Sequence, residues 1–204
     1  MTRLTLSCMV LVLSSTTLAG HGRGVHGLGW GCGQGEALST GAARNASFAC
    51  APLSQRMSLK SWSHHGEDVQ LLKSVFCDVC PYRTYVELGA LDGIKYSNTL
   101  LLEKQFNWHG LLIEGQPANG KKLNKTRGAS GRNVIVQSAI CAVAGNVSFT
   151  GKPGFGTAGV KADMSAAFLN TWGYRFKHEY TVPCRPLGEI MNAAGIRFVS
   201  LALG

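Results

Sequence analysis

Residues 83–93, with the sequence RTYVELGALDG, decide the fold that we expect for this chain. Residues 85–88 read as a short buried strand, which runs directly into a turn bounded by Gly89 and Gly93. A strand that opens into a glycine loop and then a helix is how open α/β sheets build a nucleotide site at their carboxyl ends. Glycine also permits backbone angles that are closed to other residues, and it lets a ligand approach the main chain closely.

The charges at this loop indicate which kind of ligand it would bind. Glu87 and Asp92 provide carboxylates at the rim, where a pyrophosphate would need positive partners. Gly89 and Gly93 have the spacing Gly-x-x-x-Gly, which differs from the dinucleotide motif Gly-x-Gly-x-x-Gly. We therefore expect a ligand that donates hydrogen bonds from amine and hydroxyl groups.

A second strand with an acidic end extends the expected site. Residues 110–114, GLLIE, are apolar up to Glu114, as is typical of a strand that is covered on both faces. An acidic residue at the end of the second strand of such a sheet accepts hydrogen bonds from ribose hydroxyls. A glutamate at a strand end can also be simply solvated, but the glycine loop upstream favours ribose binding.

The rest of the folded region alternates between helices and strands. Apolar residues in 69–76 fall on one helical face, Ser97 or Asn98 would cap a helix over 100–106, and Pro117 would begin a third helix. Further strands are expected at 133–140, 147–149, 180–184 and 197–201, with helices at 165–172 and 187–194. This alternation predicts an α/β fold with a parallel sheet and helices on both faces.

Residues 1–19 have the layout of a secretory signal peptide. A basic start, a short apolar run and a small-residue exit before Gly20 are typical of such peptides. The run is short for a membrane span, which needs about 20 mostly apolar residues. The alternatives are an uncleaved anchor, through which alone we expect membrane contact, and an organelle transit peptide, since no acidic residue precedes Glu36.

Glycosylation and cysteine patterns favour the secretory pathway, with the ER or Golgi lumen or the outside of the cell as destination. Asn-x-Ser/Thr acceptors occur at Asn45, Asn124 and Asn146. Removal of Cys8 with the signal leaves six of the seven cysteines, an even number that is compatible with disulfides. Their pairing cannot be deduced from their spacing.

The pair Cys77 and Cys80 has three interpretations. A redox motif would need a thioredoxin-like context, and a zinc site would need a second ligand pair at suitable spacing, and the sequence contains neither. We favour a disulfide for these cysteines and expect no metal.

The composition divides the chain into three parts. Residues 20–60 follow the signal and are rich in glycine, so they cannot bury enough apolar surface to offset their ordering entropy, and we expect a disordered linker. Residues 61–204 are sufficient for one domain core. The net charge of +9 is spread along the chain without an aromatic-interleaved basic stripe, so nucleic-acid binding is not expected.

Taken together, these motifs resemble the FkbM family of AdoMet-dependent methyltransferases. The matching segments are SHHGED at 63–68, VELGALDG at 86–93, SNTL at 97–100, LE at 102–103, WHGLLIE at 108–114 and VPCRPL at 182–187. They occur in the family's order and extend over most of the expected domain.

The resemblance implies a Rossmann-like class I methyltransferase fold and the transfer of a methyl group from S-adenosyl-L-methionine (AdoMet), typically to an oxygen. The acceptor would be a hydroxyl group of a glycan, a lipid or a small molecule. The implied cofactor-binding residues are Glu87, Gly89, Asp92 and Gly93 beside the methionine part, Glu114 at the ribose, and Ser138 and Ala139 near the adenine. The catalytic base is unknown, with Asp92 and His109 as candidates on residue type alone.

The end of the chain departs from the family pattern. Where the family has Ser-Leu-Asp-x-Glu-Gly, residues 200–204 read SLALG, so we expect a domain that lacks its C-terminal strands. The lost acidic residues put activity in question. The same motifs resemble the Star-type relatives, which implies as an alternative a non-catalytic protein of ER and Golgi cargo trafficking. A third interpretation is a secreted structural domain with a vestigial site.

Overall fold

The computed structural model describes residues 9–13, 51–52, 58–76, 78–79 and 84–196 of the chain. Its central sheet consists of β1 (Met9–Leu13), β4 (Thr84–Leu88), β5 (His109–Glu114) and β6 (Val134–Gln137), which lie side by side in that order. Two further short strands, β2 (Ala51–Pro52) and β3 (Asp78–Val79), pair with each other. The expected linker, Cys77, Cys80 and the expected strand over 197–201 lie largely or wholly outside the described residues.

Three strands of the central sheet are parallel, as the sequence predicts. In the register, Leu88 of β4 lies opposite Ile113 of β5, which lies opposite Val136 of β6. The α/β class is therefore confirmed, and three neighbouring parallel strands are consistent with a Rossmann-like fold.

β1 runs antiparallel to β4, with Leu13 opposite Thr84. This strand lies inside the segment that was expected to be a signal peptide. Cleavage of that segment would remove this neighbour and open the edge of β4, a hazard for aggregation.

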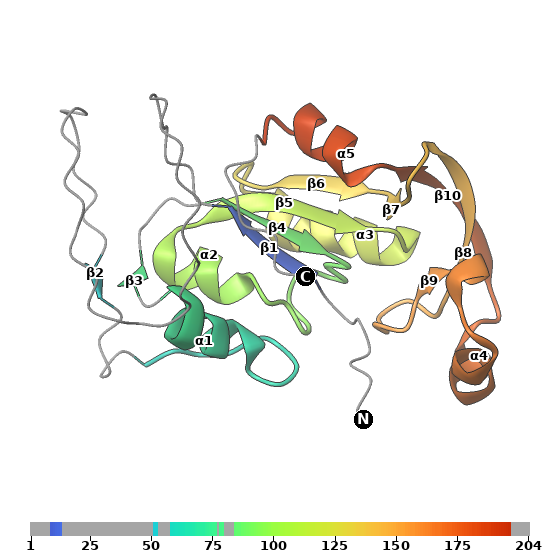
Figure 1. Ribbon diagram of the computed structural model, residues 1–204, viewed down its shortest axis with the longest axis horizontal. Coiled ribbons are helices and arrows are strands. Elements are labelled where there is room, and N and C mark those ends of the chain that lie inside the picture. The colour runs from blue at the N-terminus through green and yellow to red at the C-terminus, as the bar shows by residue number, and fades with distance from the viewer. Residues whose placement is uncertain (1–8, 14–50, 53–57, 77, 80–83, 197–204) are drawn as a thin grey trace, which may run out of the picture.

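Helices cover both faces of the central sheet (Figure 1). α2 (Leu100–Phe106) and α3 (Pro117–Leu123) pack on one face, and α5 (Leu187–Ala193) packs on the other. α1 (Glu67–Leu71) continues into the π-helical turn η1 (Leu72–Phe76), and α3 continues into η2 (Asn124–Gly128).

Two apolar clusters lie between these layers. The cluster under α2 and α3 comprises Leu72, Tyr85, Ala90, Leu101, Leu102, Phe106, Trp108, Leu112 and Leu123, all buried. The cluster under α5 comprises Val86, Leu111, Ile113, Ile190 and Met191. Successive residues of β4 and β5 thus point to opposite faces, which explains why neighbouring positions in both strands are apolar.

The expected third strand is the main correction to the predicted architecture. It breaks at Ser138 into β6 and a separate strand β7 (Ala139–Ile140), which belongs to a second sheet. This sheet also contains β10 (Glu179–Arg185), β8 (Gly145–Thr150) and β9 (Gly159–Val160). β10 pairs antiparallel with β8, so the segments expected at 147–149 and 180–184 do not extend the parallel sheet.

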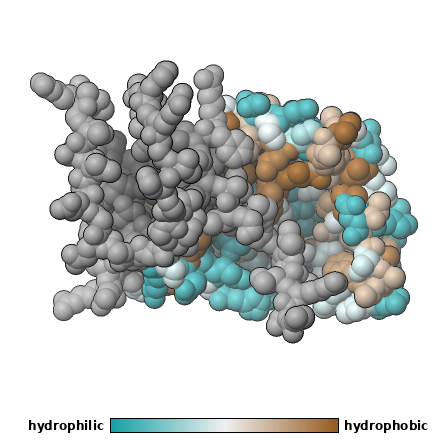
Figure 2. Space-filling model, in the orientation of Figure 1, coloured by the Kyte–Doolittle hydropathy of each residue, from teal (hydrophilic) through white to brown (hydrophobic). Residues whose placement is uncertain are grey.

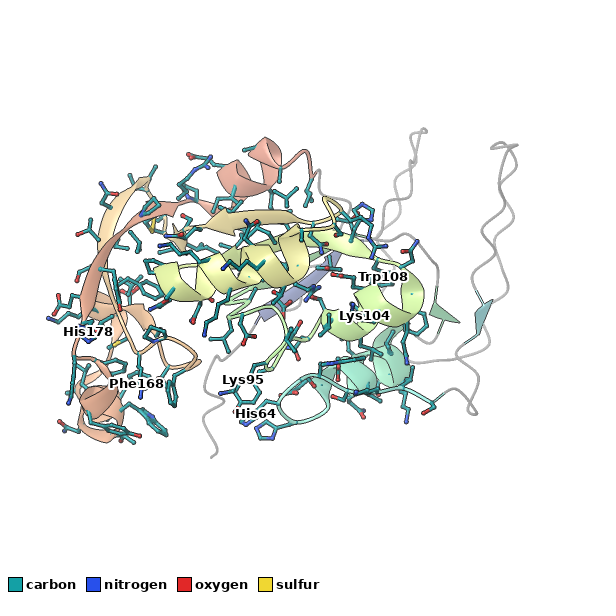
Figure 3. All side chains as sticks on the ribbon, turned by 180° about the vertical axis from the view of Figure 1, so that it is seen from behind. His64, Lys95, Lys104, Trp108, Phe168 and His178 are labelled. Carbon is teal, nitrogen blue, oxygen red and sulfur yellow. A yellow bond between two sulfur atoms is a disulfide. The ribbon has the colours of Figure 1, made fainter. Side chains whose placement is uncertain are left out.

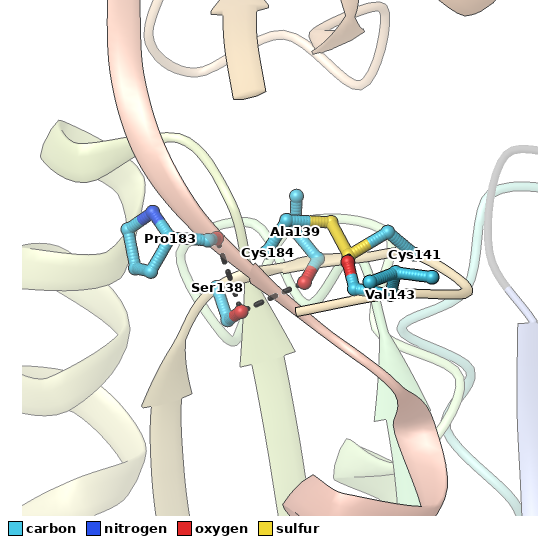
Figure 4. Close-up of a disulfide and its surroundings, with 6 residues drawn as sticks. All are labelled: Ser138, Ala139, Cys141, Val143, Pro183 and Cys184. Atoms are coloured by element: carbon cyan, nitrogen blue, oxygen red, sulfur yellow. Dashed lines mark hydrogen bonds between the residues drawn. A yellow bond between two sulfur atoms is a disulfide. The ribbon is translucent and has the colours of Figure 1, made fainter. Parts of the chain in front are cut away.

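Side-chain bonding explains the break at Ser138. Its hydroxyl oxygen lies 2.7 Å from the main-chain oxygen of Ala139 and 3.1 Å from that of Pro183, so its single proton is shared between them and joins the chain to β10 at this point (Figure 4). A disulfide between Cys141 and Cys184 joins the two segments a few residues further on. This pairing was not deducible from cysteine spacing.

Three short helical segments follow β9 of the second sheet. The 3₁₀ turn η3 (Lys161–Asp163) precedes α4 (Ala166–Trp172), and η4 (Gly173–Arg175) follows it.

Figure 2 shows hydrophobic surface on the β7 and β10 side of the molecule, where Ile140 and Val143 are exposed. Among the described helices, none has the length and apolar character that crossing a bilayer requires.

Candidate functional site

The glycine loop folds against the carboxyl end of β5. The main-chain N–H groups of Gly89 and Ala90 both donate to the oxygen of Ile113, at 2.9 and 3.1 Å. The N–H of Leu91 donates to Oε2 of Glu114, at 2.8 Å. The structure therefore brings the loop and Glu114 together at one edge of the sheet, as the sequence predicts.

The two glycines that were singled out are required for different reasons. Gly89 has a φ of +69° with open space around it, so only its backbone angle favours glycine. Gly93 has a φ of +81°, and a Cβ there would lie 2.5 Å from Cγ of Arg127 and 2.8 Å from Cδ1 of Leu123. Leu91 between them also has a positive φ, 53°, which is a costly conformation for a residue with a side chain.

Glu114 is buried, and its two carboxyl oxygens accept hydrogen bonds from main-chain groups. Oε1 accepts from the N–H of Gln116 at 2.7 Å, and Oε2 accepts from Leu91. Burial raises the pKa of Glu114 to about 7, although these hydrogen bonds and the side chain of Asn119 act in the opposite direction. Each oxygen keeps a second lone pair, so the group is able to accept bonds from a ligand diol as well.

Glu87 does not lie at the rim, which corrects the position expected for it. It is fully buried and accepts hydrogen bonds from Ser97 Oγ at 3.0 Å, Asn98 N at 2.9 Å and Thr99 Oγ1 at 2.5 Å. Its carboxylate thus joins β4 to the segment that leads into α2.

Arg127 is the functional neighbour that the sequence reasoning missed. Its guanidinium is buried behind the glycine loop, where it donates to the oxygen of Gly93 at 2.9 Å and to Glu103 at 2.6 Å. It also donates to the hydroxyl of Tyr85 at 2.6 Å and lies 3.9 Å from Glu87. A signal was present: an arginine near the end of a helix, downstream of acidic residues at 87 and 103, but only the fold brings them together.

The two candidates for a catalytic base have different positions. Asp92 is partly exposed in the glycine loop, and its Oδ1 accepts from the N–H groups of Ile94 at 3.0 Å and Lys95 at 2.8 Å. His109 begins β5, at the opposite end of the strand from Glu114. About five residues of strand, at roughly 3.3 Å each, separate it from the site, so His109 is not suited to act as the base.

Ser138 and Ala139 are near Glu114 through their main chain only. The N–H of Ser138 donates to the main-chain oxygen of Glu114 at 3.1 Å. The side chain of Ser138 is engaged with β10, and Ala139 packs in the core of the second sheet with Phe149 and Val182. The side chains of both residues are therefore engaged within the protein.

Two buried amide groups beside Glu114 were not predicted. Gln116 and Asn119 are both fully buried, and among the described residues neither Gln116 Nε2 nor Asn119 Nδ2 has a partner within hydrogen-bonding geometry. Their oxygens are engaged: that of Gln116 accepts from the N–H of Asn119, and that of Asn119 accepts from the N–H of Gly154, both at 2.8 Å. Unpaired buried donors are costly, and such groups at a site edge are suited to a ligand with acceptor atoms.

Comparisons of this chain with protein-family models, with curated proteins and with solved structures found no match.

Proposed function

We propose that this chain is an AdoMet-dependent methyltransferase of the FkbM type, with a class I methyltransferase fold, which methylates a hydroxyl group of a glycan, a lipid or a small molecule. The observation that carries the proposal is the buried carboxyl of Glu114 at the end of the second parallel strand, bonded to the main chain of the glycine loop. Ribose-binding carboxylates in open α/β sheets occupy this position.

The chemistry of the site supports this cofactor over a dinucleotide. The carboxyl groups of Asp92 in the loop and of Glu114 at the end of β5 suit the ammonium, sulfonium and ribose hydroxyl groups of AdoMet and would repel a pyrophosphate. The unpaired amides of Gln116 and Asn119 would donate to acceptor atoms of the same ligand. In this proposal, Gly89 and Gly93 admit the methionine part close to the backbone, and the main chain at Ser138 and Ala139 borders the adenine.

The work of the protein in this reaction is mainly alignment. The cofactor, when bound, supplies a methyl group that its sulfonium has already activated. The loop and Glu114 would hold the cofactor so that the acceptor oxygen, the methyl carbon and the sulfur lie in line. Of the two candidate bases only Asp92 lies at this edge, and it would take the proton that the acceptor hydroxyl releases.

Calorimetric titration of the full chain with AdoMet tests the proposal. Glu114→Gln keeps the size of the side chain but removes the carboxylate, so it should weaken binding about tenfold or more, as expected for hydrogen bonds to a charged group. Glu189→Gln, on the exposed surface of α5, is the matched control and should bind as the wild type does. An absence of heat with the folded wild-type chain would refute the cofactor proposal.

The disulfide supports a secretory location for this protein. A bond between Cys141 and Cys184 is stable in the oxidising ER and Golgi lumen and is rare in the cytosol. Asn124 and Asn146 are both exposed, as glycosylation there would require. A shift in gel mobility on deglycosylation of the protein from secreting cells would test this location, and unmodified protein with free thiols would contradict it.

One observation favours the second candidate, a Star-like, non-catalytic protein of ER and Golgi cargo trafficking. The carboxylate of Glu87 is engaged by Ser97, Asn98 and Thr99, as a residue kept for the fold would be. A chain that folds, resides in the ER or Golgi and takes up no AdoMet would favour this candidate over the enzyme.

A further inference from the structure

A cluster of cationic and aromatic side chains borders the proposed cofactor site. We call it the cationic aromatic cluster, and it consists of His64, Lys95, Tyr96, Lys152 and Phe155. Lys95 lies two residues after Gly93 of the glycine loop, and Figure 3 shows it beside His64 at the same edge of the molecule. None of these residues has a role in the proposed binding of AdoMet.

Two ammonium groups of this cluster converge on one ring. Nζ of Lys95 lies 5.5 Å from the ring centre of Phe155, and Nζ of Lys152 lies 5.3 Å from it. Among the described residues, no carboxylate lies within ion-pair distance of either ammonium, whereas Lys161 is paired with Glu179. Because no carboxylate of the described residues neutralises either ammonium, this part of the surface is suited to an anion.

The exposed ring of Tyr96 gives the cluster a second binding property, whereas Phe155 is half-buried. Tyr96 is 40% exposed, with Lys95 4.8 Å above its ring and the imidazole of His64 4.3 Å away. Its φ of 61° is unusual for a residue with a large side chain, and strain of this kind concentrates at functional sites. Exposed ring faces stack on flat, ring-containing ligands.

The loop that carries Lys152 and Phe155 is attached to the site on two sides. The N–H of Gly154 donates to Asn119 Oδ1 at 2.8 Å, and Lys95 Nζ donates to the oxygen of Gly154 at 3.2 Å. This single residue thus connects the loop to the start of α3 and to the end of the glycine loop. The cluster is therefore held next to the edge where an acceptor hydroxyl would meet the activated methyl group.

We propose that the cationic aromatic cluster binds the acceptor, and that this acceptor is an anionic sugar or a similar ring-containing hydroxyl compound that carries a phosphate or carboxylate. Lys95 and Lys152 bind the anionic group, and the rings of Tyr96 and Phe155 contact the face of the sugar. The role of the bound compound as methyl acceptor rests on the proposed function. The binding of an anionic sugar to the cluster does not depend on it.

Binding to the full chain tests the inference with four probes: glucose 6-phosphate, glucuronate, glucose and inorganic phosphate. We expect glucose 6-phosphate or glucuronate to bind at least about tenfold more tightly than glucose or phosphate, because a charge-assisted hydrogen bond contributes on that scale. The preferred probe of the two identifies the anionic group. Equal affinity for glucose and both anionic sugars would overturn the proposal, because the charge would then contribute nothing. Equal affinity for phosphate and glucose 6-phosphate would also overturn it, because the cluster would then bind an adventitious ion only.

Charge-removing variants locate the site. Lys95→Gln and Lys152→Gln should each weaken binding of the preferred anionic sugar about tenfold, since each loses one cation. Lys104→Gln, on the exposed side of α2, is the matched control and should change the affinity by less than about twofold. All three lysines are exposed, so the variants should keep the wild-type melting temperature, and folded Lys95 and Lys152 variants with unchanged affinity would contradict the assignment.

The same titrations separate this inference from the proposed function. AdoMet binding without a preference for anionic sugars would leave the methyltransferase proposal intact and overturn the acceptor class. Anionic-sugar binding that depends on Lys95 and Lys152, in a chain that takes up no AdoMet, would support the cluster as a binding site and refute the enzyme.

Discussion

Glu87 and Glu114 lie near the carboxyl ends of neighbouring parallel strands, yet their surroundings differ in charge and in hydrogen-bond donors. Glu87 is surrounded by donors and has the guanidinium of Arg127 at 3.9 Å. Glu114 has two main-chain donors, and among the described residues no cation pairs with it. Burial without a cation raises the pKa of Glu114 to about 7. The comparison teaches that a buried carboxylate that stabilises the fold has a cation and several donors around it. A buried carboxylate without a cation keeps the capacity to bind a positively charged or hydroxyl-bearing group.

Replacing Arg127 should have the largest effect on stability, because it removes the cation beside Glu87. Arg127→Met leaves Glu87 and Glu103 buried without their cation, and we expect a loss of about 3–5 kcal/mol in the free energy of unfolding. Urea denaturation followed by circular dichroism measures this loss. Arg132→Met, on the exposed surface, is the matched control and should cost less than about 0.5 kcal/mol. Equal costs for both variants would refute the buried network.

The pH dependence of stability tests whether Glu114 is buried without a cation. In the unfolded chain its pKa is near 4.5, and in the fold it is about 7, so between these values the unfolded state loses a proton that the folded state keeps. The stability due to this group is therefore complete below pH 4.5 and is lost as the pH rises through 7. Relative to Glu114→Gln, the wild type should lose up to roughly 3 kcal/mol over this interval.

Parallel pH series of chemical denaturation for the wild type and Glu114→Gln check this result. Two parallel curves would mean that Glu114 titrates normally and is not the uncompensated carboxyl described above. Under the methyltransferase proposal, AdoMet affinity should rise as the pH passes 7, because the ionised carboxylate accepts both ribose hydroxyls. The Glu114→Gln variant should lack this rise.

The two glycines of the loop give a smaller, graded effect. Gly93→Ala must strain a positive φ and also meet Arg127 and Leu123, so it should cost roughly 2–3 kcal/mol. Gly89→Ala meets open space and should cost only about 1 kcal/mol, for the backbone angle alone. Thermal denaturation of both variants measures the difference. A Gly89 variant that is the less stable of the two would contradict the positions described here.

Much of the central sheet was predictable, because local patterns determine it. The short strand expected at 85–88 and the apolar run before Glu114 correspond to β4 and β5, and Pro117 begins α3 as expected. The glycine loop next to Glu114 was predicted from motif spacing and is confirmed by the bond to Leu91.

The errors arose where contacts between distant segments decide the structure. Nothing in residues 133–140 alone indicates that the strand divides at Ser138, since the cause is a main-chain acceptor at Pro183. The burial of Glu87 and the importance of Arg127 have the same origin, because their partners are separated by tens of residues in the chain.

The sequence by itself determined the α/β class, the parallel pairing that follows from strand–helix alternation, and the position of an acidic strand end beside a glycine loop. These features follow from periodicity and from backbone angles, which are local properties. Only the tertiary structure decided which carboxylate has a cation beside it, which one is buried without a cation, and which lysines lie near the ring of Phe155. Burial and charge compensation depend on the packing of distant segments, and no single stretch of sequence contains that information.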